Sequence, residues 1–217
     1  MSKKIMKIGV TQFPGTNCDR DILIMADRLG LKAQLIWHED RFDKKDFDAI
    51  VIPGGFSYGD YLRCGAMAAQ SAVMKSVRDF AEYGAPVLSI CNGFQILCES
   101  GLLPGVLLRN KNLNFIDKWV SLQCQSPSDF FASTLSSGEI IHLPIAHGEG
   151  RYHVDENIYQ EMKQRGQIWL TYMDNPNGAV HDIAGVSNKS KNVFGLMPHP
   201  ERALFDWMGG IDGRSFL

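Results

Sequence analysis

The stretch that most constrains the fold of this chain is VLSICNGFQ, residues 87–95, in which an apolar run stops abruptly at Cys91. Pro86 to Ile90 has the length and apolar character of a short buried strand. Apolar residues then recur at helical spacing until Gly101, which supplies a helix stop. The pattern therefore predicts a strand, a sharp turn at Cys91 and a helix.

The position of Cys91 on this corner favours a nucleophile. A tight strand-to-helix turn lifts one side chain out of the sheet and needs small residues two positions before and after it, here Ser89 and Gly93. The amide of Asn92 would lie at a helix N-terminus, where free N–H groups and the positive end of the helix dipole favour an anion. Such a place favours a thiolate and can stabilise an oxyanion. The alternative is a buried core cysteine.

The N-terminal half predicts a parallel sheet. Lys7 to Phe13, Lys32 to Trp37 and Ala49 to Ile52 have strand character, and helical patterns separate them. The last of these strands is apolar throughout, which suggests burial on both faces. Strands that alternate with helices imply right-handed crossovers and a parallel sheet covered on both sides. We therefore predict a doubly wound α/β fold.

The rest of the chain extends this sheet. A helical apolar stripe runs from Ala66 to Phe80, and after Gly101 the segments Leu113 to Leu122 and Glu139 to Ile145 have the pattern of antiparallel strands. The sheet is thus expected to become mixed. No break in composition suggests a second core, so we expect one domain over residues 1–217.

Composition excludes several classes of function. The 217 residues carry 22 basic and 24 acidic side chains without a basic block, which argues against nucleic acid or an anionic membrane as partner and favours a small ligand. Five cysteines, an odd number, follow a start without an apolar signal segment, so we expect reduced thiols and a cytoplasmic protein. Neither cysteine nor histidine spacing supports a structural metal.

The strand ending at Ile52 leads into a glycine-rich segment, Pro53 to Asp60. Ligands of doubly wound folds bind at the carboxyl ends of the strands. The paired glycines Gly54 and Gly55 permit backbone angles that turn N–H groups towards a ligand, which would give a second oxyanion donor. An ordinary glycine turn is the alternative. The G-x-x-x-x-G-K-[ST] pattern of a phosphate-binding loop is absent.

A base for the cysteine is predicted near the C-terminus, in the sequence MPHPER. Prolines bias the residues before them towards extended backbone, in which side chains at i and i+2 share a face. His199 and Glu201 would then form a base and its orienting carboxylate. His147 and Glu149 offer the same spacing, and only the prolines favour His199.

Together these residues resemble a known family. Four segments are similar to the class I (triad) glutamine amidotransferases, and within them to the glutaminase subunits of phosphoribosylformylglycinamidine synthase: Pro53–Gly65, Cys91–Leu97, His147–Arg151 and Met197–Arg202. The resemblance spans nearly the whole chain. One departure is Ser89, where the family usually has glycine, although serine is small enough for the turn.

The resemblance implies a flavodoxin-like fold and a set of site residues. Cys91 would be the nucleophile, His199 the base and Glu201 its orienter, while the amides of Gly55 and Asn92 would form the oxyanion hole. Further residues would contact glutamine: Gly54, Phe56, Gln95, His147, Gly148 and Glu149.

The resemblance also implies the reaction. Glutamine would be hydrolysed to glutamate and ammonia through a cysteinyl thioester. A synthetase subunit, together with a small accessory subunit, would use the ammonia with ATP to convert formylglycinamide ribonucleotide to the amidine in purine biosynthesis. ATP and Mg²⁺ would belong to that synthetase, with no cofactor in this chain. Because glycines let a peptide turn its N–H group at low steric cost, we further expect that docking of the synthetase orders the segment Gly54 to Gly59 and switches on hydrolysis.

Two other functions remain open at this point. The chain could be a class I amidotransferase subunit that serves a different acceptor, or a flavodoxin-like binding subunit with an inert cysteine. Release of ammonia from glutamine separates the binding subunit from both enzymes.

Overall fold

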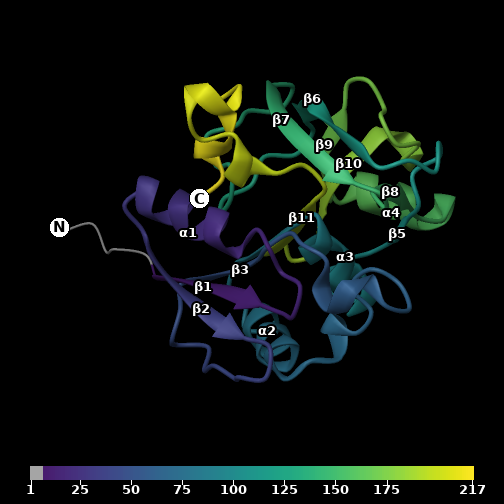
Figure 1. Cartoon of the computed structure of the whole chain (residues 1–217). Helices are drawn as coiled ribbons and strands as arrows, with labels where there is room; N and C mark the ends of the chain where they lie inside the picture. The colour runs from purple at the N-terminus through teal and green to yellow at the C-terminus, as the bar shows by residue number, and fades with distance from the viewer. Residues whose placement is uncertain (1–6) are drawn as a thin grey trace.

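A mixed sheet of nine strands forms the centre of the computed structural model, which describes residues 7–217 (Figure 1). Its strand order is β2-β1-β3-β4-β11-β10-β9-β6-β7, and a separate pair is formed by β5 and β8. The strands are β1 (Lys7–Gln12), β2 (Lys32–Trp37), β3 (Ala49–Ile52), β4 (Val87–Ile90), β5 (Val106–Leu108), β6 (Ile116–Cys124), β7 (Ile140–His147), β8 (Arg151–His153), β9 (Ile168–Tyr172), β10 (Ile183–Ser187) and β11 (Val193–Leu196).

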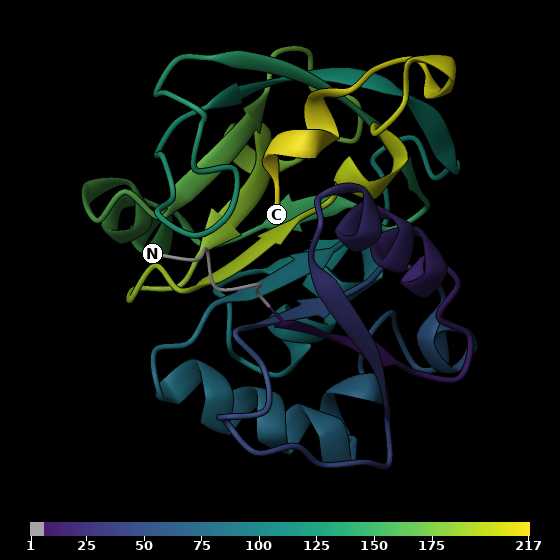
Figure 2. The same cartoon turned by 90° about the vertical axis from the view of Figure 1, so that its left-hand side faces the viewer.

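The predicted doubly wound α/β architecture is confirmed. Strands β2, β1, β3, β4 and β11 run parallel, whereas β10, β9, β6 and β7 continue the sheet in antiparallel pairs. Figures 1 and 2 show helix α1 on one side of the parallel strands and α2 on the other. The α-helices are α1 (Asp19–Arg28), α2 (Ala72–Glu82), α3 (Asn92–Glu99) and α4 (Glu156–Gln164).

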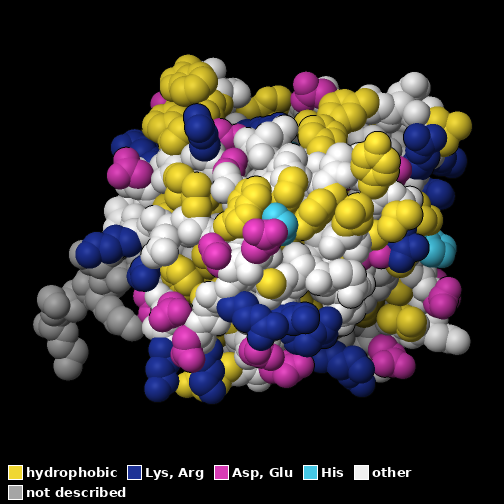
Figure 3. All heavy atoms as spheres, turned by 60° about the horizontal axis from the view of Figure 1, so that its bottom comes forward, with side chains coloured by type: hydrophobic (Ala, Val, Ile, Leu, Met, Phe, Trp, Pro, Cys, Tyr) yellow, Lys and Arg dark blue, Asp and Glu magenta, His cyan; other side chains and the backbone are white. Residues whose placement is uncertain are grey.

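Burial explains the apolar runs of the central strands. Every residue of β3, β4 and β11 is buried, because each of these strands has a neighbour on both sides and is covered on both faces. On the face seen in Figure 3, lysine and arginine side chains lie beside acidic ones instead of forming one broad basic surface. Within residues 7–217, every helix is too short or too polar to serve as a membrane-spanning segment.

Several element boundaries differ from the sequence prediction. The helical stripe expected from Ala66 begins only at Ala72, because Ser71 is extended with ψ of 163°. Just before it, Gly65 has φ of +82° and lies so close to α3 that a Cβ there would be 2.7 Å from the Ile96 nitrogen. Only glycine fits at this point, where the chain turns before the helix begins. The strand expected from Leu113 starts at Ile116, since Leu113 has a positive φ of 61°.

Candidate active site

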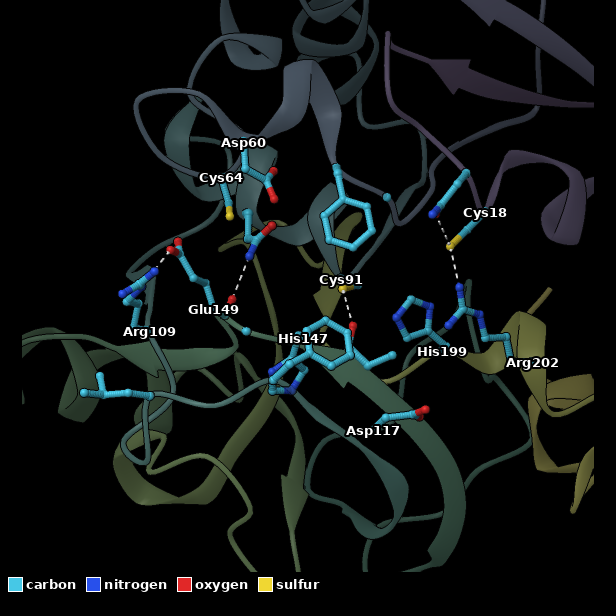
Figure 4. Close-up of a pocket in the computed structure, with 18 residues that line it drawn as sticks. Cys18, Asp60, Cys64, Cys91, Arg109, Asp117, His147, Glu149, His199 and Arg202 are labelled. Carbon is cyan, nitrogen blue, oxygen red and sulfur yellow. Dashed lines mark hydrogen bonds and ion pairs between the residues drawn. The ribbon is translucent and has the colours of Figure 1, made fainter.

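Three neighbouring parallel strands end at the same edge of the sheet and bring the predicted site segments together. Strand β4 pairs with β3 on one side and with β11 on the other. The residues that follow are Gly54 after β3, Cys91 after β4 and His199 after β11. Figure 4 shows Cys91, His147 and His199 around one cavity at this edge.

Cys91 occupies a strained turn directly before helix α3. Its backbone has φ of 51° and ψ of −106°, values that residues with side chains rarely adopt. The amide of Cys91 donates to the Leu196 carbonyl at 2.8 Å, which ties the turn to β11. A Cβ at Gly93 would lie 2.1 Å from the Ile52 carbonyl oxygen, so only glycine lets α3 approach β3 this closely.

The serine that departs from the family pattern fits this turn. Ser89 is fully buried in β4, and its hydroxyl donates a hydrogen bond to the Phe194 carbonyl oxygen at 2.9 Å. The extra oxygen therefore has a partner in the neighbouring strand β11, and it is not an unpaired polar group in the core.

His199 and Glu201 meet, although not for the reason predicted. Their Nδ1 and Oε1 atoms are 2.6 Å apart, and both side chains are buried. Pro200 does not continue an extended segment, because it begins a short 3₁₀ turn, Pro200–Arg202, that curls Glu201 back towards the imidazole. The amide of His199 donates to the Pro144 carbonyl at 2.8 Å and holds the turn against β7.

The environment of His199 favours its protonated form. Burial alone would lower the pKa of His199, but the Glu201 carboxylate and the neighbouring Cys91 sulfur raise it, and the balance lies well above the usual value. Its Nε2 atom has no hydrogen-bond partner among residues 7–217. Since His199 and Cys91 line the same cavity, the structure offers a proton-carrying imidazole beside the sulfur.

His147 has a different environment, which separates the two rival histidines. Its Nδ1 atom lies 3.0 Å from Asn110 Oδ1, whereas the Glu149 carboxylate is 3.6 Å from Arg109 Nε. Burial, and then the charge of His199, lower the pKa of His147 to about 4. His147 is therefore neutral near pH 7 and lacks the carboxylate that the spacing suggested.

The backbone around Gly54 and Gly55 is packed against the site. Gly55 forms an isolated bridge with Thr16. The hydrogen bonds beside it run from the Cys18 amide to the Gly54 carbonyl and from the Phe56 amide to the Gly15 carbonyl, so the Gly55 amide takes no part in them. Its φ is +148°, and a Cβ would lie 2.8 Å from the Thr16 Cα. Asn92 is the first residue of α3, so its amide lacks an intrahelical acceptor. Gly55 lines the same cavity as Cys91, and Asn92 follows Cys91 directly in the chain.

A cavity of about 710 Å³ adjoins these groups. Of the residues expected to contact substrate, it is lined by Phe56, Gln95, His147, Gly148 and Glu149. Gly54, Asn92 and Glu201 do not line it: Gly54 packs beneath Cys91 and His199, and the Asn92 side chain is held by the Ser57 amide at 3.0 Å and by Gln95 at 2.8 Å. Gln95 Nε2 in turn donates to the Glu149 carbonyl at 2.6 Å.

Other cavity residues were missed by the sequence analysis. Cys18, Asp60, Cys64, Arg109, Asp117 and Arg202 also line it. Burial raises the pKa of Asp60 and of the Cys64 thiol, which lies near the carboxylates of Asp60 and Glu149. Cys18 follows the turn after β1, at the same sheet edge as Cys91, and this position in the sequence could have identified it.

The loop after Gly55 carries unusual backbone strain. Three of its residues that are not glycine have positive φ: Tyr58 at 54°, Asp60 at 55° and Leu62 at 68°. Such conformations each cost energy and are frequent at functional loops. At the tip, Tyr61 is 73% and Leu62 is 90% exposed. The loop therefore combines strain, exposed apolar side chains and direct contact with the cavity.

Comparisons with known proteins agree with this site. Residues 5–212 match the family model of the CobB/CobQ-like glutamine amidotransferase domain. The chain is 52% identical over 213 residues to the phosphoribosylformylglycinamidine synthase subunit PurQ of Alkaliphilus metalliredigens, covering 98% of this chain and 94% of the relative. It is 50% identical over 212 residues to PurQ of Helicobacter hepaticus, covering 98% and 96%.

Solved structures give the same result. The structure of PurLQS from Thermotoga maritima contains a chain with a TM-score of 0.89 and 42% identity, covering 97% of this chain and 95% of that one. A putative GMP synthase component from Thermoplasma acidophilum shares the fold, with a TM-score of 0.63 at 14% identity and coverage of 98% and 90%. The chain therefore belongs to the glutamine amidotransferase family, and within it to the PurQ subunits of phosphoribosylformylglycinamidine synthase.

Proposed function

We propose that this chain is the glutaminase subunit of phosphoribosylformylglycinamidine synthase. It hydrolyses glutamine and delivers ammonia to a synthetase subunit, which converts formylglycinamide ribonucleotide to formylglycinamidine ribonucleotide with ATP in purine biosynthesis. The observation that carries the proposal is the meeting of Cys91 with the His199–Glu201 pair at the ends of adjacent strands, in a chain half identical to PurQ proteins.

The first half-reaction makes a thioester. The Cys91 thiolate attacks the carboxamide carbon of glutamine, and the carbonyl oxygen becomes an oxyanion that accepts hydrogen bonds from the Gly55 and Asn92 amides. His199 carries the proton needed next, since its pKa is raised. It gives that proton to the amide nitrogen, the C–N bond breaks, and ammonia leaves a γ-glutamyl thioester on Cys91.

The second half-reaction restores the enzyme. His199, now neutral, removes a proton from water, and the resulting hydroxide attacks the thioester carbon. The C–S bond breaks, glutamate leaves, and His199 regains its proton beside the Cys91 thiolate. Glu201 stabilises the positive charge of the imidazolium, because its carboxylate stays 2.6 Å from His199 Nδ1.

Recognition of glutamine requires groups of both charges, since the α-amino and α-carboxyl groups form a zwitterion. The cavity supplies the carboxylates of Glu149 and Asp60 and the guanidinium of Arg109. We assign substrate contacts to Phe56, Gln95 and the loop His147–Glu149, and a supporting role to Gly54, which packs beneath the triad.

The partners and location follow from the same assignment. The synthetase and its small accessory subunit would bind this chain, and ATP with Mg²⁺ would be used by the synthetase. The name of the Thermotoga maritima assembly, PurLQS, supports a complex of this kind. A cytoplasmic location is supported by the five cysteines, which are all free thiols.

The test is glutamate release at saturating glutamine, with and without the synthetase, its accessory subunit and their ligands. We expect the complete mixture to be at least about tenfold faster, which corresponds to about 1.4 kcal/mol of transition-state stabilisation. The strained loop around Tyr58 and Asp60 is the element that docking would order. Cys91→Ala should abolish release in every mixture. Activity retained in that variant would contradict the mechanism, and equal rates in all mixtures would contradict the switch.

A further inference from the structure

Three buried side chains with metal-binding atoms converge beside the cavity. One donor atom from each of Cys18, His199 and Glu201 lies within 4.8 Å of the other two. Cys18 directly precedes α1, whereas the other two follow β11, so the cluster joins segments far apart in the chain. His199 and Glu201 take part in hydrolysis as proposed above, whereas Cys18 has no role in those steps.

Two atoms of this cluster lack partners. His199 Nε2 and Glu201 Oε2 are buried without a hydrogen bond to residues 7–217, although such atoms usually have one. Arg202 opposes a cation, because its guanidinium donates to the Cys18 sulfur at 3.1 Å and must release that sulfur when an ion binds. The carboxylates of Glu201 and of Asp21, whose Oδ2 atom lies 3.9 Å from Arg202 Nε, offset part of its charge.

The donor types favour zinc. A thiolate, an imidazole and a carboxylate are the ligands that Zn²⁺ prefers, whereas Mg²⁺ and Ca²⁺ prefer oxygen alone. At ordinary zinc–ligand distances, tetrahedral ligands are separated by about 3.3–3.8 Å. The His199 Nδ1 and Glu201 Oε1 atoms are 2.6 Å apart and would have to separate by about 1 Å, whereas the Cys18 sulfur, within 4.8 Å of the other donors, would have to approach them by up to about 1 Å. This makes one ion bound by all three sterically feasible.

The cavity gives an ion access to the cluster. Cys18 and His199 line it, while Glu201 lies behind His199. Gly54 keeps the two lining residues adjacent, because a Cβ there would lie 2.9 Å from His199 Cε1 and 3.1 Å from Cys18 Sγ. An ion that enters from the cavity therefore meets both donors, and its fourth position stays open to water.

We propose that Cys18, His199 and Glu201 form an inhibitory binding site for Zn²⁺ or a similar thiophilic divalent ion. The ion is a regulator that comes and goes, and it takes no part in the reaction. Bound there, it occupies the imidazole and carboxylate that move protons for Cys91. The inhibition rests on the proposed glutaminase function, whereas binding of the ion does not.

Binding is tested on the full chain with Co²⁺, whose thiolate charge-transfer absorption reports a sulfur ligand. We expect one equivalent to bind to the wild type, and the dissociation constant to rise at least about tenfold in Cys18→Ser and in Glu201→Gln. Cys91→Ser and Cys98→Ser should bind as the wild type does. Cys98 is a suitable control because it is a buried thiol whose sulfur faces the Pro104 carbonyl.

The outcomes are decisive even if Cys18→Ser fails to fold. Cadmium-113 resonance of the wild type distinguishes one sulfur ligand from none or two, and only one sulfur agrees with the proposal. Absence of stoichiometric binding, retained affinity in a folded Cys18→Ser, or lost affinity in Cys91→Ser would each overturn it. In the assembled synthetase complex, Zn²⁺ should inhibit glutamate release, and a chelator should restore it. Binding without inhibition would refute the regulatory role alone.

Discussion

Replacing Glu201 by glutamine tests the electrostatics of the site. The substitution preserves size and removes one charge, 2.6 Å from His199 Nδ1. An opposite charge at this range shifts a pKa by about 1–3 units. Burial lowers the pKa of His199, whereas the charges of Glu201 and, to a smaller extent, Cys91 raise it. The variant loses the larger of these two charge effects, so the pKa of His199 must fall. We expect turnover to drop by about two to four orders of magnitude, the scale of lost acid–base catalysis.

The assay is the pH profile of kcat/KM for glutamate release in the assembled complex. The alkaline limb reports loss of the His199 proton in the free enzyme, so Glu201→Gln should move that limb to lower pH by about 1–3 units. The free energy of unfolding should change with pH for the same reason. A histidine whose pKa is higher in the folded state than in the unfolded state stabilises the fold at pH values below its unfolded-state pKa, and this stabilisation is lost as the pH rises through its folded-state pKa. The variant should therefore be destabilised more at pH 6 than at pH 9. A slower variant with an unmoved alkaline limb would refute this reasoning.

Gly93→Ala should reduce the free energy of unfolding by at least about 2 kcal/mol, because its Cβ would lie 2.1 Å from the Ile52 carbonyl oxygen. Urea unfolding measures this, and Gly148→Ala is the control: its Cβ would lie 3.9 Å from Phe115, so the free energy of unfolding should change by under about 0.5 kcal/mol. Folding lowers the pKa of His147 from 6.5 to about 4, so the folded state should lose up to about 3 kcal/mol of stability as the pH falls from 6.5 to about 4. His147→Gln should lose less stability over this range, and parallel curves of unfolding free energy against pH for the two proteins would disprove the lowered pKa. A diazoketone analogue of glutamine should label Cys91 first, since burial raises the pKa of the Cys64, Cys98 and Cys124 thiols, and uniform labelling by mass spectrometry would contradict this.

The sequence predicted those parts of the fold that local pattern determines. The apolar runs of β3 and β4 and the small residues around Cys91 suffice to place two strands and the turn between strand and helix. Strands β10 and β11 were not predicted. Residues 183–187 and 193–196 are buried throughout, as β3 and β4 are, but Gly185 and Gly195 interrupt their apolar runs, and glycine is depleted in strands. Their place in the sheet depends on partners distant in sequence.

The His147 and His199 rivalry shows the same limit at the site. Both histidines have a glutamate two residues later, and local geometry does not separate them. Tertiary contacts do. Asn110 takes the Nδ1 atom of His147, and Arg109 takes the carboxylate of Glu149, so that pair never forms. Arg109 and Asn110 lie about 40 residues earlier in the chain, so the local spacing of histidine and glutamate cannot predict these contacts.

The register of β11 against β4 is what assembles the catalytic groups. Leu196 is level with Ile90, so the residues directly after them, Met197 and Cys91, leave the sheet at the same height. Two residues after Met197 the chain reaches His199, whose amide donates a hydrogen bond to the Pro144 carbonyl. A slip of one residue would turn the β11 side chains to the opposite face and move His199 by one strand rise, about 3.3 Å. That distance exceeds the tolerance of a proton transfer, so the parallel pairing of these two strands is a condition for catalysis as well as for folding.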